Sequence, residues 1–172
     1  MISAIVCVDN NWGIGYQGNL LAHIPEDMKF FKETTTNNVV IMGRKTYDSL
    51  PLKPLPNRIN IVITSRVDNY EIDKNGTIFV SMDFIKLYLS TLPMSSPINY
   101  YIIGGAQIYK ELLPYCHTSY VTKVNHSYDN VDTYFPNLDK DENWEMWIET
   151  HRMKNKYCGI EYELHIYENI KI

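Results

Sequence analysis

One acidic side chain lies where burial would cost most. The stretch "HIPEDMKFFKETT" spans residues 23–35, and at helical spacing one face carries Ile24, Asp27, Met28, Phe31 and Thr35. Asp27 therefore interrupts an apolar stripe, whereas Glu26 falls on the opposite, polar face. A helix dipole stabilises an acid in the first turn by only about 0.3–1 kcal/mol, which hardly offsets the burial of a carboxylate. We therefore interpret Asp27 as a functional group.

Basic and hydroxyl side chains follow two short apolar runs. Residues 38–42 lead into Gly43-Arg44-Lys45-Thr46, and residues 59–64 end in Thr64-Ser65-Arg66. Ligands of open α/β sheets bind beyond the carboxyl ends of the strands, and guanidinium groups beside a helix N-terminus suit a phosphate. An arginine there favours NADP over NAD, because it can accept a 2′-phosphate. Solvated charges after strands are the alternative, and taken alone they are common.

A third strand end carries two glycines. The run 98–103 ends at Ile103 and continues into Gly104-Gly105, where missing side chains would let a diphosphate approach the backbone. A plain strand-to-helix turn is equally compatible with this pair alone. Three such ends in one sheet favour a nucleotide site.

The other glycine-rich stretch is not a dinucleotide fingerprint. "GIGYQG" at 13–18 has the G-x-G-x-x-G spacing, but Pro25 delays the helix to well beyond Gly18. A Rossmann unit joins these glycines directly to the helix whose N-terminus meets the pyrophosphate. We interpret residues 9–24 as a mobile loop over a site.

Apolar periodicity predicts the elements that must position these residues. Helices are expected from Pro25, in "RKTYDSL", in "MDFIKLYLSTL", where Phe84, Leu87 and Tyr88 repeat at helical spacing, and in "AQIYKELL". Strands alternate with these helices first and then follow one another, which indicates an α/β sheet that is parallel early and antiparallel late. The expected strands are 2–8, 38–42, 59–64, 77–80, 98–103, 119–124, 145–153 and 160–168.

Composition fits one globular unit. The 172 residues are 45% apolar, and the net charge of −4 argues against a general nucleic-acid binder. Three cysteines at wide spacing predict neither a disulfide framework nor a zinc site. No repeat, linker, signal peptide or long apolar span is evident, so we expect a single domain over 1–172, in the cytoplasm and without a membrane anchor.

Seven ordered motifs carry a resemblance to a known family. "DNNWGIGYQGNL", "IPEDMKFFK", "VVIMGRKTYDSL", "PLPNR", "IVITSR", "YIIGGAQIY" and "DTYFP" resemble dihydrofolate reductases in order and spacing over nearly the whole chain. The resemblance implies a central mixed eight-stranded sheet, mostly parallel with an antiparallel C-terminal edge, flanked by about four helices. It also implies NADPH-dependent reduction of 7,8-dihydrofolate to tetrahydrofolate for one-carbon metabolism, with hydride transfer to pterin C6 and protonation at N5. Pterin-mimicking antifolates would then bind, the protein would act as a monomer, and no metal would be needed.

The resemblance assigns site residues position by position. The catalytic group would be Asp27, Leu20, Tyr109 and Thr122. The substrate would contact Asp27, Tyr109 and Thr122 together with Ile5, Val6, Met28, Phe31, Leu50, Leu55, Arg58 and Ile103. The cofactor would contact Cys7, Ile14, Gly15, Asn19, Leu20, Gly43, Arg44, Lys45, Thr46, Ser49, Thr64, Ser65, Arg66, Ile103, Gly104, Gly105, Ala106, Gln107, Ile108, Tyr109 and Thr133. For each apolar residue, plain core packing is the alternative.

Individual roles follow from the same resemblance. Asp27 would accept paired hydrogen bonds from the pterin, and Thr122 would steady that acid. Arg58 would clamp the substrate's glutamate carboxylate, a bidentate task that lysine does poorly. Tyr109 would lie beside the nicotinamide and pterin rings, and the Gly104–Gly105 bond would be cis.

One position departs from the family pattern. Leu20-Leu21-Ala22 stands where the family usually has Leu-Pro-Trp, whose indole N–H holds a water that links pterin to the acid. Ala22 has no donor, so the water relay and the affinity for antifolates are open. His23 could supply a donor, although a loop histidine is more often exposed. We interpret Cys116-His117 as a helix end and not as a metal site.

Two rival functions are compatible with the same motifs. A pyrimidine-intermediate reductase of riboflavin synthesis shares the fold but would not require the pair Asp27 and Arg58. A binding module could keep NADPH and lack catalysis, and Ala22 is the feature that favours it. RNA binding would need basic clusters beside exposed aromatic residues, and the positive charge is missing.

Overall fold

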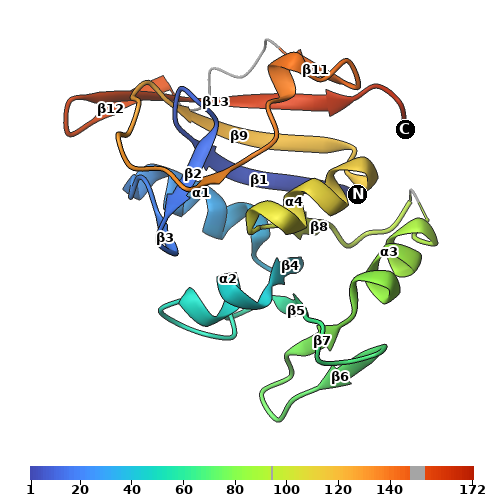
Figure 1. Cartoon of the computed structure of the whole chain (residues 1–172). Coiled ribbons are helices and arrows are strands. Elements are labelled where there is room, and N and C mark those ends of the chain that lie inside the picture. Colours follow the sequence, from blue (N-terminus) through green and yellow to red (C-terminus); the bar gives the residue numbers. More distant parts are fainter. Residues whose placement is uncertain (94, 148–153) are drawn as a thin grey trace.

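The computed structural model describes residues 1–93, 95–147 and 154–172, in which a twisted mixed sheet dominates. Ten strands pair in the order β11-β13-β9-β1-β8-β4-β5-β7-β6, with β12 also on β13, and Figure 1 shows them stacked from β11–β13 at the top to β6 at the bottom. Their bounds are β1 Ile2–Val8, β4 Val39–Gly43, β5 Ile59–Ile63, β6 Tyr70–Ile72, β7 Ile78–Val80, β8 Tyr100–Ile102, β9 Thr118–Val124, β11 Trp144–Trp147, β12 Lys154–Tyr157 and β13 Ile160–Asn169.

The predicted change of strand direction is confirmed. β9, β1, β8, β4, β5 and β7 run parallel to one another, whereas β13 pairs antiparallel with β9, β11 and β12. The central strands are almost fully buried, as expected for parallel strands covered on both faces. Their carboxyl ends therefore meet along one edge of the sheet.

Four α-helices cover the two faces of the sheet: α1 Pro25–Thr35, α2 Arg44–Ser49, α3 Met82–Ser90 and α4 Ala106–Leu112. The alternation along β1 separates the two cores, because Ala4 packs with residues of α3 and α4, and Ile5 packs with residues of α1 and α2. α1 begins with Pro25 at its first position, where the missing N–H is not needed. Ser81 caps α3 by accepting a hydrogen bond from the Phe84 amide.

Four expectations need correction or limits. The expected mixed sheet of about eight strands is confirmed, and in the described residues two short edge strands that were not expected, β6 and β12, bring it to ten. The expected strand 145–153 corresponds to β11 only at its start, and residues 148–153 lie outside the described part. Helix α3 is confirmed, but its buried residues are Ile85 and Leu89, and Leu87 is 67% exposed. Within the described residues, no helix is long and apolar enough to cross a membrane.

The fourth correction concerns residues 9–24, which are not an irregular loop. They contain β2 Gly13–Tyr16 and β3 Asn19–Leu20, and together with β10 Thr133–Tyr134 these form a second sheet in the order β10-β2-β3. The local Gly and Asn content concealed this pairing, since the partner strand lies more than a hundred residues away. This small sheet lies beside the carboxyl end of β1 (Figure 1).

Candidate active site

The acid singled out by the sequence lies next to a strand hydroxyl. Asp27 is in the first turn of α1, and its Oδ1 accepts a hydrogen bond of 2.6 Å from Thr122 Oγ1. Thr122 is 1% exposed in the middle of β9. The predicted partnership of the two residues is therefore present in the geometry, and the hydrogen bond leaves the other carboxylate oxygen available to a ligand.

Burial sets the protonation of this acid. Desolvation raises the pKa of Asp27 above the ordinary value of a carboxyl, and the hydrogen bond from Thr122 opposes this in part because it favours the charged form. The neighbouring thiol of Cys7 has its pKa raised by burial and, to a smaller extent, by the negative charge of Asp27. Cys7 is therefore a neutral thiol, and the protein holds a poised carboxyl in an apolar surrounding.

An apolar wall extends from Asp27 along α1 and the sheet. Five of the predicted substrate residues belong to one cluster, namely Ile5, Phe31, Leu50, Leu55 and Ile103. Met28 is one residue beyond the acid and 45% exposed. Val6 points to the opposite face from Ile5 and belongs to the cluster of Ile14 and Tyr109, two residues that are predicted to lie beside the bound rings. Tyr109 is buried and donates a 2.7 Å hydrogen bond to the Ile5 carbonyl, which fixes its ring behind β1.

A guanidinium lies at the far end of the same wall. Arg58 donates through Nη1 to Thr35 Oγ1 (3.0 Å) and through Nε to the Pro56 carbonyl (3.0 Å). It also stands 5.9 Å from the centre of the Phe31 ring. Partial burial lowers the pKa of Arg58 slightly from its ordinary value, but an arginine stays charged. The pocket thus has a carboxyl at one end and a cation at the other.

The three strand ends singled out in the sequence are neighbours. β8, β4 and β5 are adjacent and parallel, so Gly104-Gly105, Gly43-Arg44 and Thr64-Ser65 follow them along one edge. The Gly43 amide donates to the Gly104 carbonyl at 2.7 Å, and the Gly104–Gly105 bond is cis as expected. Gly43 and Gly104 are buried at this edge, Gly105 is half-buried and Ser65 is exposed.

Glycine is required where these ends meet. A Cβ on Gly43 would come within 3.0 Å of Ile108 Cγ1, and one on Gly105 within 3.4 Å of Thr46 Oγ1. Side chains here would fill the cradle between the two helix starts. The cationic side chains around it are Arg44, paired with Asp48 and 5.3 Å from the Phe79 ring, and the exposed Lys45 and Arg66. The remaining predicted cofactor residues of this edge are Thr46 and Ser49 on α2, Thr64 and Ser65 after β5, and Ala106, Gln107 and Ile108 on α4.

The small sheet forms a lid at the mouth of the site. Gly15 pairs with Leu20 on one side and Thr133 on the other, which brings together predicted cofactor residues from both segments, and Asn19 belongs to the same strand β3. Asp132 accepts hydrogen bonds from the Gln17 amide (2.9 Å) and from Thr133 Oγ1 (2.7 Å). Leu20 is exposed, and its side chain is free to cover a ligand.

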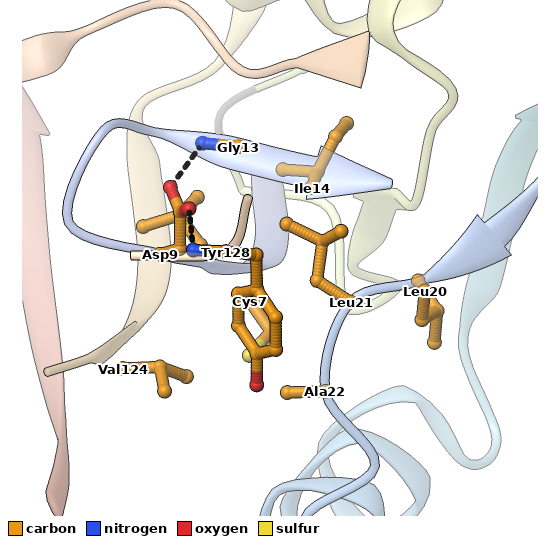
Figure 2. Close-up of a pocket in the computed structure, with 10 residues that line it drawn as sticks. Cys7, Asp9, Gly13, Ile14, Leu20, Leu21, Ala22, Val124 and Tyr128 are labelled. Carbon is orange, nitrogen blue, oxygen red and sulfur yellow. Dashed lines mark hydrogen bonds between the residues drawn. The ribbon is translucent and has the colours of Figure 1, made fainter. Parts of the chain in front are cut away.

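Sequence reasoning missed the residues that hold this lid. Asp9 is 3% exposed and accepts hydrogen bonds from the amides of Asn11, Gly13 and Tyr128, as Figure 2 shows for the last two. An acid directly after a buried strand was the available signal for Asp9. For Asp132 and Tyr128 no local signal exists, because their partners lie far away in the chain.

The departure at Ala22 has a structural counterpart. A small cavity of about 10 Å³ lies at the end of β1, lined among others by Cys7, Leu21, Ala22 and Tyr128. In Figure 2 the Tyr128 ring stands between Val124 and the chain at Leu21 and Ala22, with its hydroxyl on the Ala22 side. His23 is exposed. Cys116 donates to the Leu112 carbonyl at 3.4 Å, in agreement with a helix end.

The fold and the site together define an α/β enzyme that binds its ligands at the carboxyl edge of a mostly parallel sheet, with a poised acid in an apolar pocket. The dihydrofolate reductase family model matches residues 1–169. Dihydrofolate reductase of Bacillus subtilis (strain 168) is 38% identical over 168 residues, covering 98% of this chain and 94% of that protein. The enzyme of Buchnera aphidicola subsp. Acyrthosiphon pisum (strain APS) is 38% identical over 166 residues, covering 96% and 97%.

A solved structure agrees with these relatives. Dihydrofolate reductase from Enterococcus faecalis, complexed with NADP(H) and RAB-propyl, superposes with a TM-score of 0.80 at 32% identity, covering 98% of this chain and 96% of that one. The chain belongs to the dihydrofolate reductase family. Its activity is the NADPH-dependent reduction of dihydrofolate to tetrahydrofolate, and the reductase of riboflavin synthesis is not favoured.

Proposed function

We propose that Asp27, Thr122 and Arg58 hold dihydrofolate between them for this reduction. The observation that carries the proposal is the hydrogen bond of 2.6 Å from Thr122 Oγ1 to Asp27 Oδ1, on the helix that also contributes Phe31 to the apolar wall. The Asp27 carboxylate accepts hydrogen bonds from the amino and ring N–H groups of the pterin, mainly through Oδ2, which Thr122 leaves available. Arg58, already oriented by Thr35, binds the glutamate carboxylate of the substrate. The same pocket takes pterin-mimicking antifolates.

The cofactor occupies the cradle of the three strand ends. Support comes from the glycines there, since they bear no side chain between the backbone and a diphosphate, and a Cβ at Gly43 would come within 3.0 Å of Ile108 Cγ1. Arg44, Lys45 and Arg66 supply positive charge for phosphate groups, and Arg44 or Arg66 suits a 2′-phosphate. NADPH, when bound, supplies the hydride for pterin C6.

The protein residues orient the substrate and control the proton. Asp27 holds the edge of the pterin away from N5, so water delivers the proton to N5 while the carboxyl biases the site toward the protonated substrate. Burial raises the pKa of Asp27, which moves the titration of this carboxyl toward neutral pH. The lid of β2 and β3 excludes bulk solvent during the transfer. Tyr109, fixed on the Ile5 carbonyl, forms the back wall beside both rings.

The decisive test is oxidation of NADPH on addition of dihydrofolate, with wild type and Asp27→Asn measured in parallel. Loss of NADPH absorbance in the wild type and strongly reduced loss in the variant supports both the reaction and the role of Asp27. NADPH binding without turnover in either protein would instead favour the non-catalytic module. Asp83→Asn is a matched control, since Asp83 is an exposed acid in the first turn of α3.

We further propose that residues 1–172 form one domain that works as a monomer in the cytoplasm. The support is indirect: one continuous sheet runs through the described residues, and the three cysteines are free thiols. Light scattering of the purified chain tests the monomer, and a dimer at micromolar concentration would contradict it.

A further inference from the structure

The carboxyl end of β1 carries a feature that the roles above leave unused. The cavity lined by Cys7, Asp9, Ala22 and Tyr128 has a volume of about 10 Å³, which is roughly the space of one water molecule. Its other lining side chains are apolar, namely Val8, Ile14, Leu20, Leu21 and Val124. A water there needs polar partners, and the tyrosine hydroxyl is the strongest side-chain donor in the lining that is free to turn toward it.

The Tyr128 side chain is held in place by its own backbone. Its amide donates to Asp9 Oδ2 at 3.2 Å, and Asp9 is in turn fixed by the amides of Asn11 and Gly13. The His126 ring contacts the Tyr128 ring edge-on at 4.6 Å between centroids. Among the described residues no protein group is recorded as a hydrogen-bond partner of the Tyr128 hydroxyl, which points to the Ala22 side of the cavity (Figure 2). The hydroxyl is thus positioned by the fold but left for a non-protein partner.

The cavity adjoins the acid of the active site. Cys7 lines the cavity and is the direct neighbour of Thr122 across the β1–β9 pair. Thr122 in turn donates to Asp27. Only one strand residue therefore separates the cavity from the carboxyl that we assign to the pterin. Cys7 and Asp27 are also close enough to interact electrostatically: burial raises the pKa of Cys7, and the negative charge of Asp27 raises it further.

We propose that Tyr128 is a positioning residue for proton delivery, whose hydroxyl holds an ordered water beside Ala22 on the path from solvent to the substrate. The inference rests on the proposed function of Asp27. In the transfer a proton passes from this water through a further water to pterin N5, because Asp27 holds the pterin edge away from N5, and solvent at the lid returns a proton to the first water. Tyr128 stays protonated throughout.

Two further observations support a neutral donor at this position. Burial raises the pKa of Tyr128 above the ordinary phenol value, and the negative charge of Asp9 raises it further. Ala22 contributes no polar atom and leaves the space that the tyrosine ring and one water can share. The small side chain of Ala22 leaves the volume that the Tyr128 ring and one water need, and Tyr128 supplies the hydroxyl that Ala22 lacks.

The test is the pH dependence of single-turnover hydride transfer in Tyr128→Phe, which keeps the ring and removes the hydroxyl. We expect the rate at neutral pH to fall about 3- to 10-fold, as for one lost hydrogen bond, and to approach the wild-type rate at acid pH, where solvent protons are abundant. The midpoint of the profile then moves to lower pH, while the affinities for NADPH and for a pterin-mimicking antifolate stay within about twofold. Tyr134→Phe is the matched control, because Tyr134 is an exposed tyrosine of β10 in the same lid.

Three results would overturn the inference. The first is a Tyr128→Phe profile that coincides with that of the wild type. The second is a steady-state KM for dihydrofolate that changes while the hydride-transfer rate does not, which would make the hydroxyl a binding contact only. The third concerns the double variant Ala22→Ser, Tyr128→Phe, in which serine returns a hydroxyl to the cavity. This variant should recover part of the rate at neutral pH. If the rate does not recover, the cavity does not have the proposed role. The wild type in the same assay distinguishes the role of Tyr128 from the proposed function, because absence of turnover in the wild type would contradict the proposed function itself.

Discussion

Removal of the Thr122 hydroxyl tests how the protein sets the acidity of Asp27. Thr122→Val keeps the shape of the β9 side chain and deletes the 2.6 Å hydrogen bond to Asp27 Oδ1. A hydrogen bond to a charged group contributes about 1.5–3 kcal/mol, and one pKa unit corresponds to about 1.4 kcal/mol. Because this hydrogen bond favours the ionised carboxyl, its loss should raise the already elevated pKa of Asp27 by about 1–2 units.

The assay is the pH profile of kcat/KM for dihydrofolate, with a carboxyl titration of the free enzyme by infrared difference spectroscopy. We expect the alkaline limb to move up by about one unit and the maximal rate to fall several-fold, because Asp27 is less firmly held. Thr118→Val is the matched control, since Thr118 begins the same strand and its hydroxyl donates to Met1 Sδ at 3.8 Å, away from Asp27. An unchanged midpoint, or a shift to lower pH, refutes the reasoning.

Three other outcomes follow from the site. Arg58→Lys should raise KM for dihydrofolate about 10-fold or more with little change in kcat, and a substrate without the glutamate tail should show no difference; an equal effect on both substrates would contradict the clamp. Asp132→Ala should weaken NADPH binding about 3- to 10-fold, measured by fluorescence against an Asp129→Ala control, because the lid loses its bond from Gln17. Asp27→Asn should stabilise the ligand-free protein at neutral pH. Burial raises the pKa of Asp27 in the folded state. The contribution of the wild-type carboxyl to stability is therefore greatest below the unfolded pKa of about 4 and is lost as pH rises through the folded pKa. If the Tm difference between Asp27→Asn and wild type is the same at acid and at neutral pH, ionised Asp27 does not destabilise the folded protein.

Much of the site could be predicted because it lies on regular elements. Helical spacing alone placed Asp27 on the apolar face of α1, and strand ends alone placed Gly43, Thr64 and Gly104 on one edge. These arguments need only the periods of helix and strand and the parallel direction of the sheet. The resemblance to the family added the pairing of Asp27 with Thr122, which no local pattern could give.

The parts that were missed depend on contacts between distant segments. β2 pairs with β10, which is far away in the sequence. The sequence of residues 9–24 alone therefore predicted a loop and not a sheet. Ile5 and Val6 were both assigned to the pocket, and the strand alternation places Ile5 on the face of α1 and α2 and Val6 on the face of Tyr109. For α3, apolar residues were present all round, so the spacing could not decide which side faces the core.

The most direct measurement is hydride transfer in Asp27→Asn compared with wild type across the pH range. The account predicts a large loss at neutral pH and a much smaller loss at acid pH, because solvent protons then replace the bias that the carboxyl provides. An equal loss at every pH would contradict the proton role of Asp27 and leave it only a binding contact.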